Sequence, residues 1–250
     1  MIPCYNEGER LGEFLRQLSR LAAPYDFIDI VVVDDGSSPG HVQTTRAIVN
    51  DLQTSSNSRL SLQLQTPNQG KGAALAAGFG ASQSAIVGFV DADGATSAEE
   101  CMRLLAKFIR LRKGLGRPGA PIPAAILGSR IKMLGMTVDR HMRRHYMGRV
   151  FATLLSMMFR IPVYDSQCGC KFFWMESARP LLPFVTSQRW LWDTQLTILF
   201  FMRGIPMLEE PVSWKDAEGS KVSMLRDPLR MTMGLVRFRR QLERSGFFRS

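Results

Sequence analysis

Two apolar, β-branched segments that end in acidic residues constrain the fold most strongly. Residues 28–33 read Ile-Asp-Ile-Val-Val-Val and precede Asp34 and Asp35, and residues 85–90 read Ala-Ile-Val-Gly-Phe-Val and precede Asp91 and Asp93. Apolar runs of this length are typical of strands buried on both faces, as in parallel sheets. Ligands of open α/β sheets bind at the carboxyl ends of such strands. The sequence therefore predicts four carboxylates gathered at one edge of a parallel sheet.

Further strand and helix patterns alternate along the chain. We expect strands at 60–66 and 124–127, strand-like structure at 163–175 and an extended segment at 206–214. The spacing of apolar residues predicts helices at 72–84, 99–112, 140–159, 186–203 and 228–243. Strands alternating with helices through short turns indicate an α/β fold with a parallel sheet. No internal repeat or convincing linker is present, so we assign 1–225 to one domain and 226–250 to a basic C-terminal helix.

The charge balance indicates anionic partners. Lys and Arg number 32 against 22 Asp and Glu, a formal net charge of +10. This excess favours nucleic acid, phosphorylated small molecules or an anionic membrane surface. The basic residues belong to no recognisable nucleic-acid module, so we expect no nucleic-acid partner.

Composition excludes several other classes of protein. An apolar content of 45% is too high for a mainly disordered chain. No apolar run reaches about 18 residues, so we expect no transmembrane helix in this sequence. The first residues have acids and no apolar core, so we expect no signal peptide. Cys4, Cys101, Cys168 and Cys170 form no Cys-x-x-Cys pair and suit a reducing compartment.

The Asp-x-Asp sequence at 91–93 is the strongest candidate for a metal site. Its two carboxylates offer oxygen ligands to a hard cation, which suits Mg²⁺ or Mn²⁺ bridging a diphosphate. Converging carboxylates repel one another, and a cation would offset that repulsion. The alternative is that Asp34 and Asp93 are turn or N-cap residues. The second strand that ends in acids weakens this alternative.

Three other segments are weaker candidates, each with a structural alternative. Asn-Gln-Gly-Lys-Gly at 68–72 opens a helix, where backbone N–H groups and Lys71 could meet a phosphate, or it is a plain helix-start turn. Asp-Ser-Gln-Cys-Gly-Cys-Lys at 165–171 places dense polar groups in an apolar stretch, but lacks the second ligand pair of a zinc site. Trp214 and Lys215, followed by Gly-Ser-Lys at 219–221, form either a flap over phosphates or an ordinary charged loop.

Eight short motifs follow one another from Ile2 to about Arg239. They are Ile-Pro-Cys-Tyr-Asn-Glu at 2–7, Val-Asp-Asp-Gly-Ser at 33–37, Asn-Gln-Gly-Lys-Gly at 68–72, Asp-Ala-Asp-Gly-Ala-Thr at 91–96, Gly-Ser-Arg at 128–130, Asp-Ser-Gln-Cys-Gly at 165–169, Arg189-Trp190 with Asp193, and Glu-Gly-Ser-Lys at 218–221. Each motif is weak alone, but the ordered set resembles the family 2 glycosyltransferases. The resemblance implies the GT-A fold, a Rossmann-like and mostly parallel sheet flanked by helices.

Within that family, the resemblance is closest to members that glucosylate dolichyl phosphate. It therefore implies inverting transfer of glucose from UDP-glucose to dolichyl phosphate for protein N-glycosylation, with Mg²⁺ or Mn²⁺, at the cytosolic face of the endoplasmic reticulum membrane. Related mannose enzymes carry Gln two residues after the metal-binding Asp, whereas Ala95 stands there in this sequence. The alternatives are another polyprenyl-phosphate sugar transferase, such as a mannose transferase using GDP-mannose, and a catalytically impaired, membrane-associated relative.

The resemblance also implies roles for residues at the matching positions. The nucleotide-sugar site would contain Pro3, Tyr5, Glu7, Val32, Asp34, Lys71, Asp91, Ala92, Arg130, Lys215 and Lys221. The metal ligand would be Asp93. The catalytic residues would be Asp93, Asp165, Arg130 and Lys221, and the sugar and acceptor region would hold Gln167, Trp190 and Asp193.

Two departures from the family pattern stand out. Only Met1 and Ile2 precede Pro3, where the family's first strand has several apolar residues. Gln195 stands where the family usually has an acid, two residues after Asp193. If that acid takes part in catalysis, we expect reduced activity.

The C-terminal helix is predicted to be amphipathic and to touch a bilayer. Leu229, Met233 and Val236 lie on one face, and Met231, Leu235, Phe238 and Leu242 on the adjoining face. Five arginines, Arg226, Arg230, Arg237, Arg239 and Arg240, accompany them. Such a helix can lie in a membrane interface, together with the Met- and Phe-rich segment 151–159. The alternative is that its apolar side packs on the domain.

Overall fold

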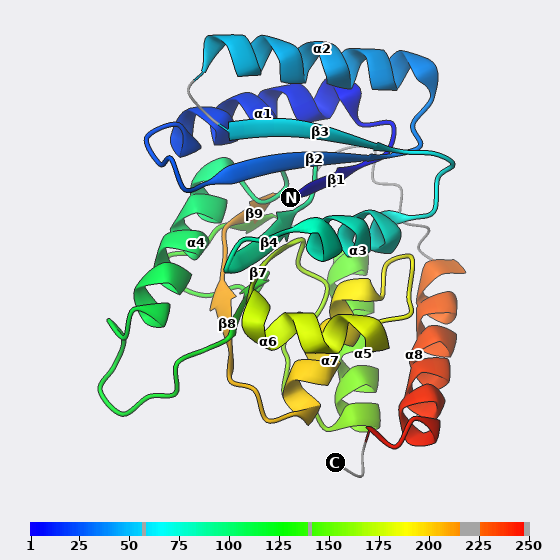
Figure 1. Cartoon of the computed structure of the whole chain (residues 1–250). Coiled ribbons are helices and arrows are strands. Elements are labelled where there is room, and N and C mark those ends of the chain that lie inside the picture. Colours follow the sequence, from blue (N-terminus) through cyan, green and yellow to red (C-terminus); the bar gives the residue numbers. More distant parts are fainter. Residues whose placement is uncertain (57–58, 140–141, 216–225, 248–250) are drawn as a thin grey trace.

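The computed structural model describes residues 1–56, 59–139, 142–215 and 226–247, and its strands form two sheets that meet edge to edge (Figure 1). In the first sheet, β2 (Asp29–Asp35) pairs in parallel with β1 (Ile2–Cys4) and with β3 (Arg59–Gln65). In the second, the strand order is β4 (Ile86–Val90), β7 (Cys170–Trp174), β5 (Ala125–Ser129) and β8 (Met207–Pro211). The Val90 N–H donates to the carbonyl of Met1 at 3.0 Å, so β1 and β4 join the two sheets.

Strand β7 is the antiparallel member of the second sheet. It pairs antiparallel with β4 and β5, whereas β5 and β8 are parallel. A separate parallel pair, β6 (Val138–Asp139) and β9 (Trp214–Lys215), lies beyond the carboxyl ends of β4 and β5. The carboxyl ends of β1, β2, β4 and β5 therefore open toward one region of the molecule.

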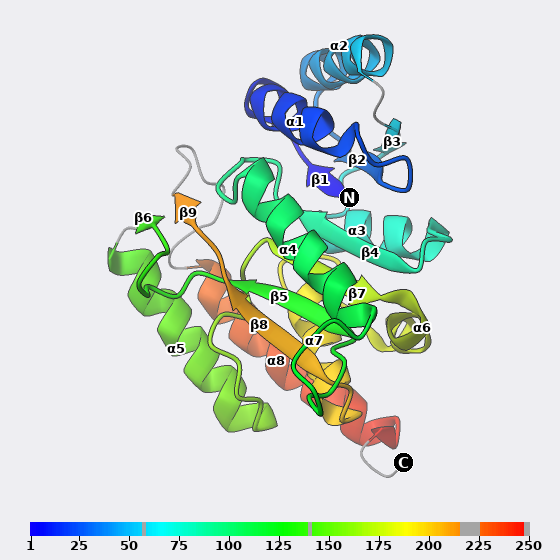
Figure 2. The same cartoon turned by 90° about the vertical axis from the view of Figure 1, so that its left-hand side faces the viewer.

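Helices cover both faces of the sheet (Figure 2), and the buried apolar side chains form two core clusters. One face carries α1 (Gly8–Ala22), α2 (Pro39–Ser55) and α4 (Ala98–Arg112). The other carries α3 (Lys71–Ala81), α6 (Met175–Ala178), the 3₁₀ helix η1 (Arg179–Phe184) and α7 (Trp192–Met202). Helices α5 (Met142–Phe159) and α8 (Arg226–Arg244) lie side by side next to α7. Burial on both faces explains why the strands read as nearly continuous apolar runs.

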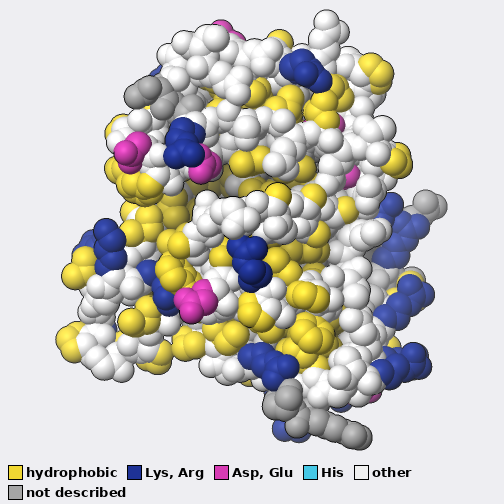
Figure 3. Space-filling view, viewed as in Figure 1, with side chains coloured by type: hydrophobic (Ala, Val, Ile, Leu, Met, Phe, Trp, Pro, Cys, Tyr) yellow, Lys and Arg dark blue, Asp and Glu magenta, His cyan; other side chains and the backbone are white. Residues whose placement is uncertain are grey.

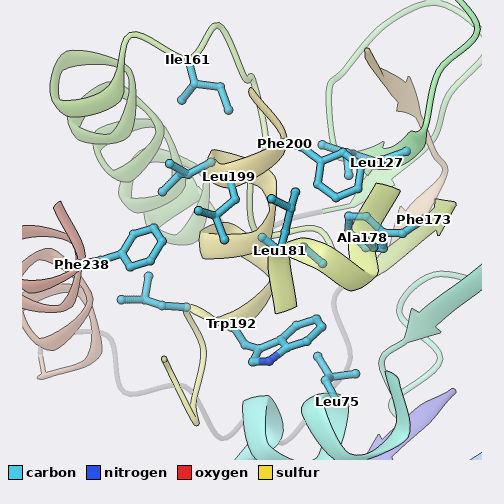
Figure 4. Close-up of a cluster of buried hydrophobic side chains, with 14 of the residues drawn as sticks. Leu75, Leu127, Ile161, Phe173, Ala178, Leu181, Trp192, Leu199, Phe200 and Phe238 are labelled. Atoms are coloured by element: carbon cyan, nitrogen blue, oxygen red, sulfur yellow. The ribbon is translucent and has the colours of Figure 1, made fainter. Parts of the chain in front are cut away.

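Helix α8 belongs to the larger of the two cores. Leu235, Phe238 and Leu242 are buried in the same cluster as Trp192 and Leu199 of α7. Figure 4 shows Phe238 directed from α8 toward that cluster. The Phe159 and Phe238 ring centroids are 6.3 Å apart, which ties α8 to the end of α5. The predicted membrane contact is therefore wrong for these three side chains, because they pack on the domain.

Most predicted elements are confirmed, with three differences. Of the predicted strand 163–175 only Cys170–Trp174 is a strand, because the N–H groups of Tyr164 and Asp165 donate to the Glu209 carboxylate. The predicted helix 186–203 begins at Trp192, since the N–H groups of Thr186 and Ser187 donate to Gln195. Helices α1, α2 and α6, the 3₁₀ helix η1 and strand β6 were not predicted from the sequence. Among the helices of the described residues, none has the length and apolar character needed to cross a bilayer.

Candidate active site

Asp91 and Asp93 lie where β4 ends, with Lys71 from the start of α3 beside them. The Lys71 ammonium donates to the Asp91 carboxylate and lies 5.1 Å from the Phe89 ring centroid. Burial lowers the pKa of Lys71, but the nearby carboxylates, led by Asp91, raise it by more, so it stands above its ordinary value. Lys71 thus carries a positive charge at the centre of the candidate site, and in this structure that charge is paired with Asp91.

Asp93 is the less neutralised of the two carboxylates. Its Oδ1 accepts a hydrogen bond from the Ala95 N–H at 3.1 Å. Burial, and then the charge of Asp91, raise the pKa of Asp93 above its ordinary value. A raised pKa of this origin is typical of a carboxyl group that gains from a nearby cation.

Gly169 allows Asp91 to adopt its position. A Cβ on Gly169 would lie 2.0 Å from Asp91 Oδ2, closer than any real contact. The Gly169 carbonyl also accepts the Asp91 N–H at 2.9 Å. The 165–171 segment, singled out in the sequence for its polar residues, therefore packs directly against the end of β4.

Arg130 and Asp165 form a buried ion pair within reach of the Asp91 charge. Arg130 Nε donates to Asp165 Oδ2 at 2.6 Å and Nη2 donates to Oδ1 at 2.8 Å. Burial lowers the pKa of Arg130, but Asp165 raises it by more, so the guanidinium is permanently charged. Its remaining nitrogen, Nη1, has no hydrogen-bonding partner among the described residues, and the Trp214 ring centroid lies 5.5 Å from the guanidinium carbon. The pair therefore presents a fixed cation at the carboxyl end of β5.

The segment that carries Asp165 and Gln167 is fastened to the start of α7. Gln167 donates to the Thr194 hydroxyl, and the fully buried Lys171 donates to Asp193 Oδ2 and to the Ser166 carbonyl, both at 2.5 Å. A buried charge is tolerated when it is paired in this way. Asp193, predicted from the sequence to lie near the acceptor, is therefore 6% exposed and bound to Lys171.

Trp190 reaches the site on the loop that precedes α7. Its ring centroid lies 5.6 Å from Lys71 Nζ. The Gln188 carbonyl accepts the Ala73 N–H at 3.0 Å, and a Cβ on Gly72 would lie 2.7 Å from the carbonyl carbon of Gln188. The glycines of the 68–72 motif thus allow this loop to sit on the start of α3.

The backbone of the 68–72 motif is held by Asp35. Its carboxylate accepts the N–H groups of Gln69 and Gly70 at 2.9 and 2.6 Å, and it also accepts the Asn68 amide. The predicted phosphate contact of these N–H groups is thereby replaced by an internal one. Asp34, at 1% exposure, accepts the Ser37 N–H and hydroxyl. The two acids that end β2 therefore hold turns; the alternative from the sequence had named Asp34, but not Asp35, for such a role.

The residues predicted for the nucleotide pocket differ in their exposure. Tyr5 is 41% exposed, whereas Pro3 and Val32 are buried in β1 and β2, one strand apart. Glu7 is ion-paired with Arg10 at 2.5 Å, and its charge contributes to the raised pKa of Asp93. Ala92 is buried between the two acids of β4. Glu7 therefore lies close enough to Asp93 for its charge to act on that carboxyl group.

Strand β9 lies next to the Asp93 turn. The Lys215 N–H donates to the Ala95 carbonyl at 2.9 Å, and the Lys215 side chain is exposed. Lys221, with the Glu-Gly-Ser-Lys motif at 218–221, lies outside the described residues. Of the predicted catalytic residues, the structure thus places Asp93, Asp165 and Arg130 at one edge of the sheet.

The donor set fits a cation that brings other ligands with it. Among the described residues, no three His, Cys, Asp or Glu side chains are grouped so as to enclose a metal. Mg²⁺ usually binds through one or two carboxylates and completes its shell with phosphate oxygens and water. Asp93, with Asp91 beside it, offers that kind of partial site.

The sequence did not reveal the contacts that three further residues make in the site. Lys171 lies within the otherwise apolar strand β7, and a lysine at such a position indicates a buried ion pair. Glu209 lies in the extended segment predicted at 206–214, directly before Glu210. Its carboxylate accepts the backbone N–H groups of Tyr164 and of Asp165, the residue that binds Arg130. Gln195, noted in the sequence for departing from the family pattern, uses its amide oxygen to hold the loop of Trp190. Their partners are distant in sequence, so spacing alone could not reveal these contacts.

Comparison with known proteins shows the family. The sequence model described as Glycosyl transferase family 2 matches residues 1–179. A protein of Saccharomyces cerevisiae named "Dolichyl-phosphate beta-glucosyltransferase" is 28% identical over 240 residues, which cover 94% of this chain and 72% of the yeast protein. A Trichomonas vaginalis protein named "Dolichyl-phosphate beta-glucosyltransferase ALG5C" is 32% identical over 243 residues, covering 94% and 68% of the two chains.

Solved structures show the same fold. Glucosyl-3-phosphoglycerate synthase from Mycobacterium tuberculosis, in complex with Mn²⁺, UDP and glucosyl-3-phosphoglycerate, superposes with a TM-score of 0.67 at 16% identity, covering 95% of this chain and 77% of that one. The family model spans the Asp91, Arg130 and Asp165 motifs. The chain therefore belongs to glycosyl transferase family 2 and is a glycosyltransferase with the GT-A fold.

Proposed function

We propose that this chain transfers glucose from UDP-glucose to dolichyl phosphate. The observation that carries the proposal is the placement of Asp93 at the carboxyl edge of the sheet, beside Asp91, whose charge acts on both Lys71 and Arg130. Two acids and two cations in one small region suit a diphosphate with its metal. The yeast and Trichomonas relatives bear names that state the acceptor and the sugar. The Mycobacterium neighbour, crystallised with UDP and Mn²⁺, supports the nucleotide and a divalent metal.

The proposed nucleotide site lies between β1, β2 and the start of α1. Tyr5 and Glu7 would contact the nucleoside from one side, with Pro3 and Val32 as the floor. Asp34 would shape the part of the pocket that meets the base by holding the Ser37 turn. Asp91 and Ala92 would lie beneath the nucleoside and the first phosphate. Asp93 would hold Mg²⁺ or Mn²⁺, which when bound neutralises charge on the UDP leaving group.

The proposed reaction needs positioning more than a strong base. An oxygen of the acceptor phosphate forms a bond to the anomeric carbon of glucose, and the bond from that carbon to the β-phosphate oxygen of UDP breaks. In-line attack inverts the α-linked donor to a β-linked product. The acceptor phosphate is already ionised, so Arg130, Lys215 and Lys221 would serve by fixing phosphates, and Asp165 by fixing Arg130. Gln167, Trp190 and Asp193 would border the sugar and acceptor.

The test is transfer of labelled sugar into a lipid product. The full chain is incubated with labelled UDP-glucose, dolichyl phosphate in detergent, and Mn²⁺ or Mg²⁺, and the organic phase is counted. The product's anomeric coupling in an NMR spectrum reports whether it is β-linked. In competition, UDP-glucose should be preferred over GDP-mannose by at least about tenfold. Transfer of mannose, or no lipid product, would refute the proposal.

We further propose that α5 and α8 rest on the membrane that holds the acceptor, at the cytosolic face of the endoplasmic reticulum. Tyr146, Val150 and Met157 form an exposed stripe on α5, at 62%, 55% and 75% exposure. Met233 and Val236 are exposed on α8, and basic side chains line its outer surface (Figure 3). Apolar side chains beside arginines suit an anionic membrane interface.

This contact is tested by sedimentation with liposomes. Binding should require phosphatidylserine, fall as salt rises, and decrease when Arg237 and Arg240 are replaced by Glu. The matched control replaces Arg16 and Arg46, exposed on α1 and α2, by Glu. A chain that stays in the supernatant at low salt, or an equal loss in the control, would contradict the contact.

A further inference from the structure

Adjacent glutamates of β8 face opposite sides of the sheet and have different partners. Glu210 binds Arg103 and Lys107 of α4 at 3.0 and 2.5 Å. Glu209 has no lysine or arginine partner among the described residues and instead accepts two consecutive N–H groups, from Tyr164 at 2.8 Å and from Asp165 at 2.6 Å. Successive side chains of a strand point to opposite faces, which explains this division. Because both Glu209 carboxylate oxygens accept hydrogen bonds from adjacent backbone N–H groups, Glu209 holds this short backbone segment in place; we call this contact the Glu209 clamp.

The clamped residue is the one that holds Arg130. The Asp165 carboxylate accepts the Arg130 N–H at 3.0 Å, its Nε at 2.6 Å and its Nη2 at 2.8 Å. Tyr164, the other clamped residue, stacks on Arg149 with the guanidinium carbon 4.0 Å from the ring centroid. Within the part of the chain that the structure describes, Tyr164 and Asp165 have no strand partner, so their N–H groups depend on Glu209.

We infer that Glu209 is a positioning residue for Arg130, acting through Asp165. Because β8 pairs in parallel with β5, which ends at Ser129 just before Arg130, Glu209 and Arg130 are carried by neighbouring strands. The paired strands β5 and β8 thereby hold both ends of a series of contacts that runs from Glu209 through Asp165 to Arg130. The guanidinium is held side-on, with Nη1 left to meet a phosphate. This inference rests on the proposed function only for the identity of that phosphate.

The first test reads the state of Arg130 without any substrate. Phenylglyoxal modifies accessible guanidinium groups, and the rate at Arg130 can be followed by peptide mass spectrometry. Glu209→Gln keeps one acceptor oxygen but turns an amide donor toward a backbone N–H, so the clamp is lost. We expect the Arg130 modification rate to rise about tenfold, since bonds to charged groups are the stronger ones. Glu210→Gln, the matched control on the same strand, should leave the rate unchanged.

The second test reads coupling in glucosyl transfer. Glu209→Gln should lower kcat/KM by about tenfold in the wild-type background and by much less in Asp165→Ala, because neighbours in one network are not additive. If the wild type transfers no glucose, the proposed function fails, while the modification rates still decide the inference. An unchanged Arg130 rate, or fully additive losses, would overturn it. If Glu209→Gln does not fold, Glu209→Asp is used instead, because it shortens the side chain by one methylene and moves the carboxylate away from the two N–H groups. It should raise the Arg130 modification rate by the same factor.

Discussion

Gly169 is the residue at which the site tolerates least change. Its missing side chain leaves room for the Asp91 carboxylate, which in turn neutralises Lys71. The sequence could single out the 165–171 segment because polar groups interrupt an apolar stretch. It could not show that the glycine in this segment is needed for a carboxylate on another strand, because β7 runs antiparallel to β4 and that pairing leaves no mark on spacing.

We predict that Gly169→Ala lowers glucosyl transfer by at least about tenfold, since a misplaced charged group weakens transition-state binding by a kcal/mol or more. The added methyl group displaces Asp91 and frees Lys71. Activity of the purified variant is measured beside Gly40→Ala, where a Cβ meets nothing within 4 Å. Normal activity in Gly169→Ala would contradict this account of the site.

A second prediction at this scale concerns the pH dependence of Asp93. Burial and Asp91 raise its pKa, so acid protonates it, and displaces a bound cation, at a higher pH than for an ordinary aspartate. In Asp91→Asn the pKa of Asp93 should fall. The pH below which Mn²⁺ and UDP binding is lost should then move down, as measured by calorimetry. The control is Asp51→Asn, at an exposed position on α2, which should leave the pH dependence of Mn²⁺ and UDP binding unchanged.

The same shift has a signature in stability. A carboxyl group with a raised folded-state pKa binds more protons folded than unfolded between its two pKa values. The free energy of unfolding should therefore fall as pH rises through that window in the wild type. Asp93→Asn should remove this part of the pH dependence, and an identical pH profile in both chains would count against the raised pKa.

At the scale of elements, the apolar strands and several amphipathic helices were predictable from the sequence. Loops whose backbone N–H groups bind side chains of other elements were not. The segments at 29–35, 86–90 and 125–129 are short apolar runs followed by turn residues, and this pattern favoured strands from the sequence alone. The segments 163–169 and 186–191 look regular in sequence but are loops, because Glu209 and Gln195 from other elements accept their N–H groups. Such competition for backbone bonds depends on the tertiary structure.

For the loop 186–190 we predict that Gln195→Leu lowers activity and Gln195→Glu preserves it. Leucine leaves the N–H groups of Thr186 and Ser187 without their acceptor, at a cost of about 1–3 kcal/mol for each group. Glutamate supplies an equivalent oxygen. Activity and thermal unfolding are measured together for both variants. Equal loss in both would mean that the position needs an amide nitrogen rather than an acceptor.

At the scale of the whole molecule, α8 is part of the fold as well as part of its basic surface. Its inner side chains lie in the larger core. The exposed arginines that the structure describes on this helix contribute to the excess of positive charge; they are Arg230, Arg237, Arg239, Arg240 and Arg244. The sequence showed both faces of this helix but not which of them met the domain. The division at 225 predicted from the sequence stays a proposal.

We predict that Phe238→Ala destabilises the chain by about 3–5 kcal/mol, the usual cost of emptying a buried aromatic site. Met233→Ala, 44% exposed on the same helix, should cost far less. Urea unfolding of the two variants makes the comparison. Similar midpoints would mean that α8 separates from the domain in solution.

The burial of every cysteine has a practical consequence. The chain has four, all are free and buried, and burial raises the pKa of the Cys168 thiol to about 12. Thiol reagents need both access and the thiolate, so the folded protein offers them little background. A single cysteine introduced at Met157 or Met233 would then carry a spin label or fluorophore almost alone. The depth of such a label in a lipid bilayer could be measured at either helix without first removing a native thiol.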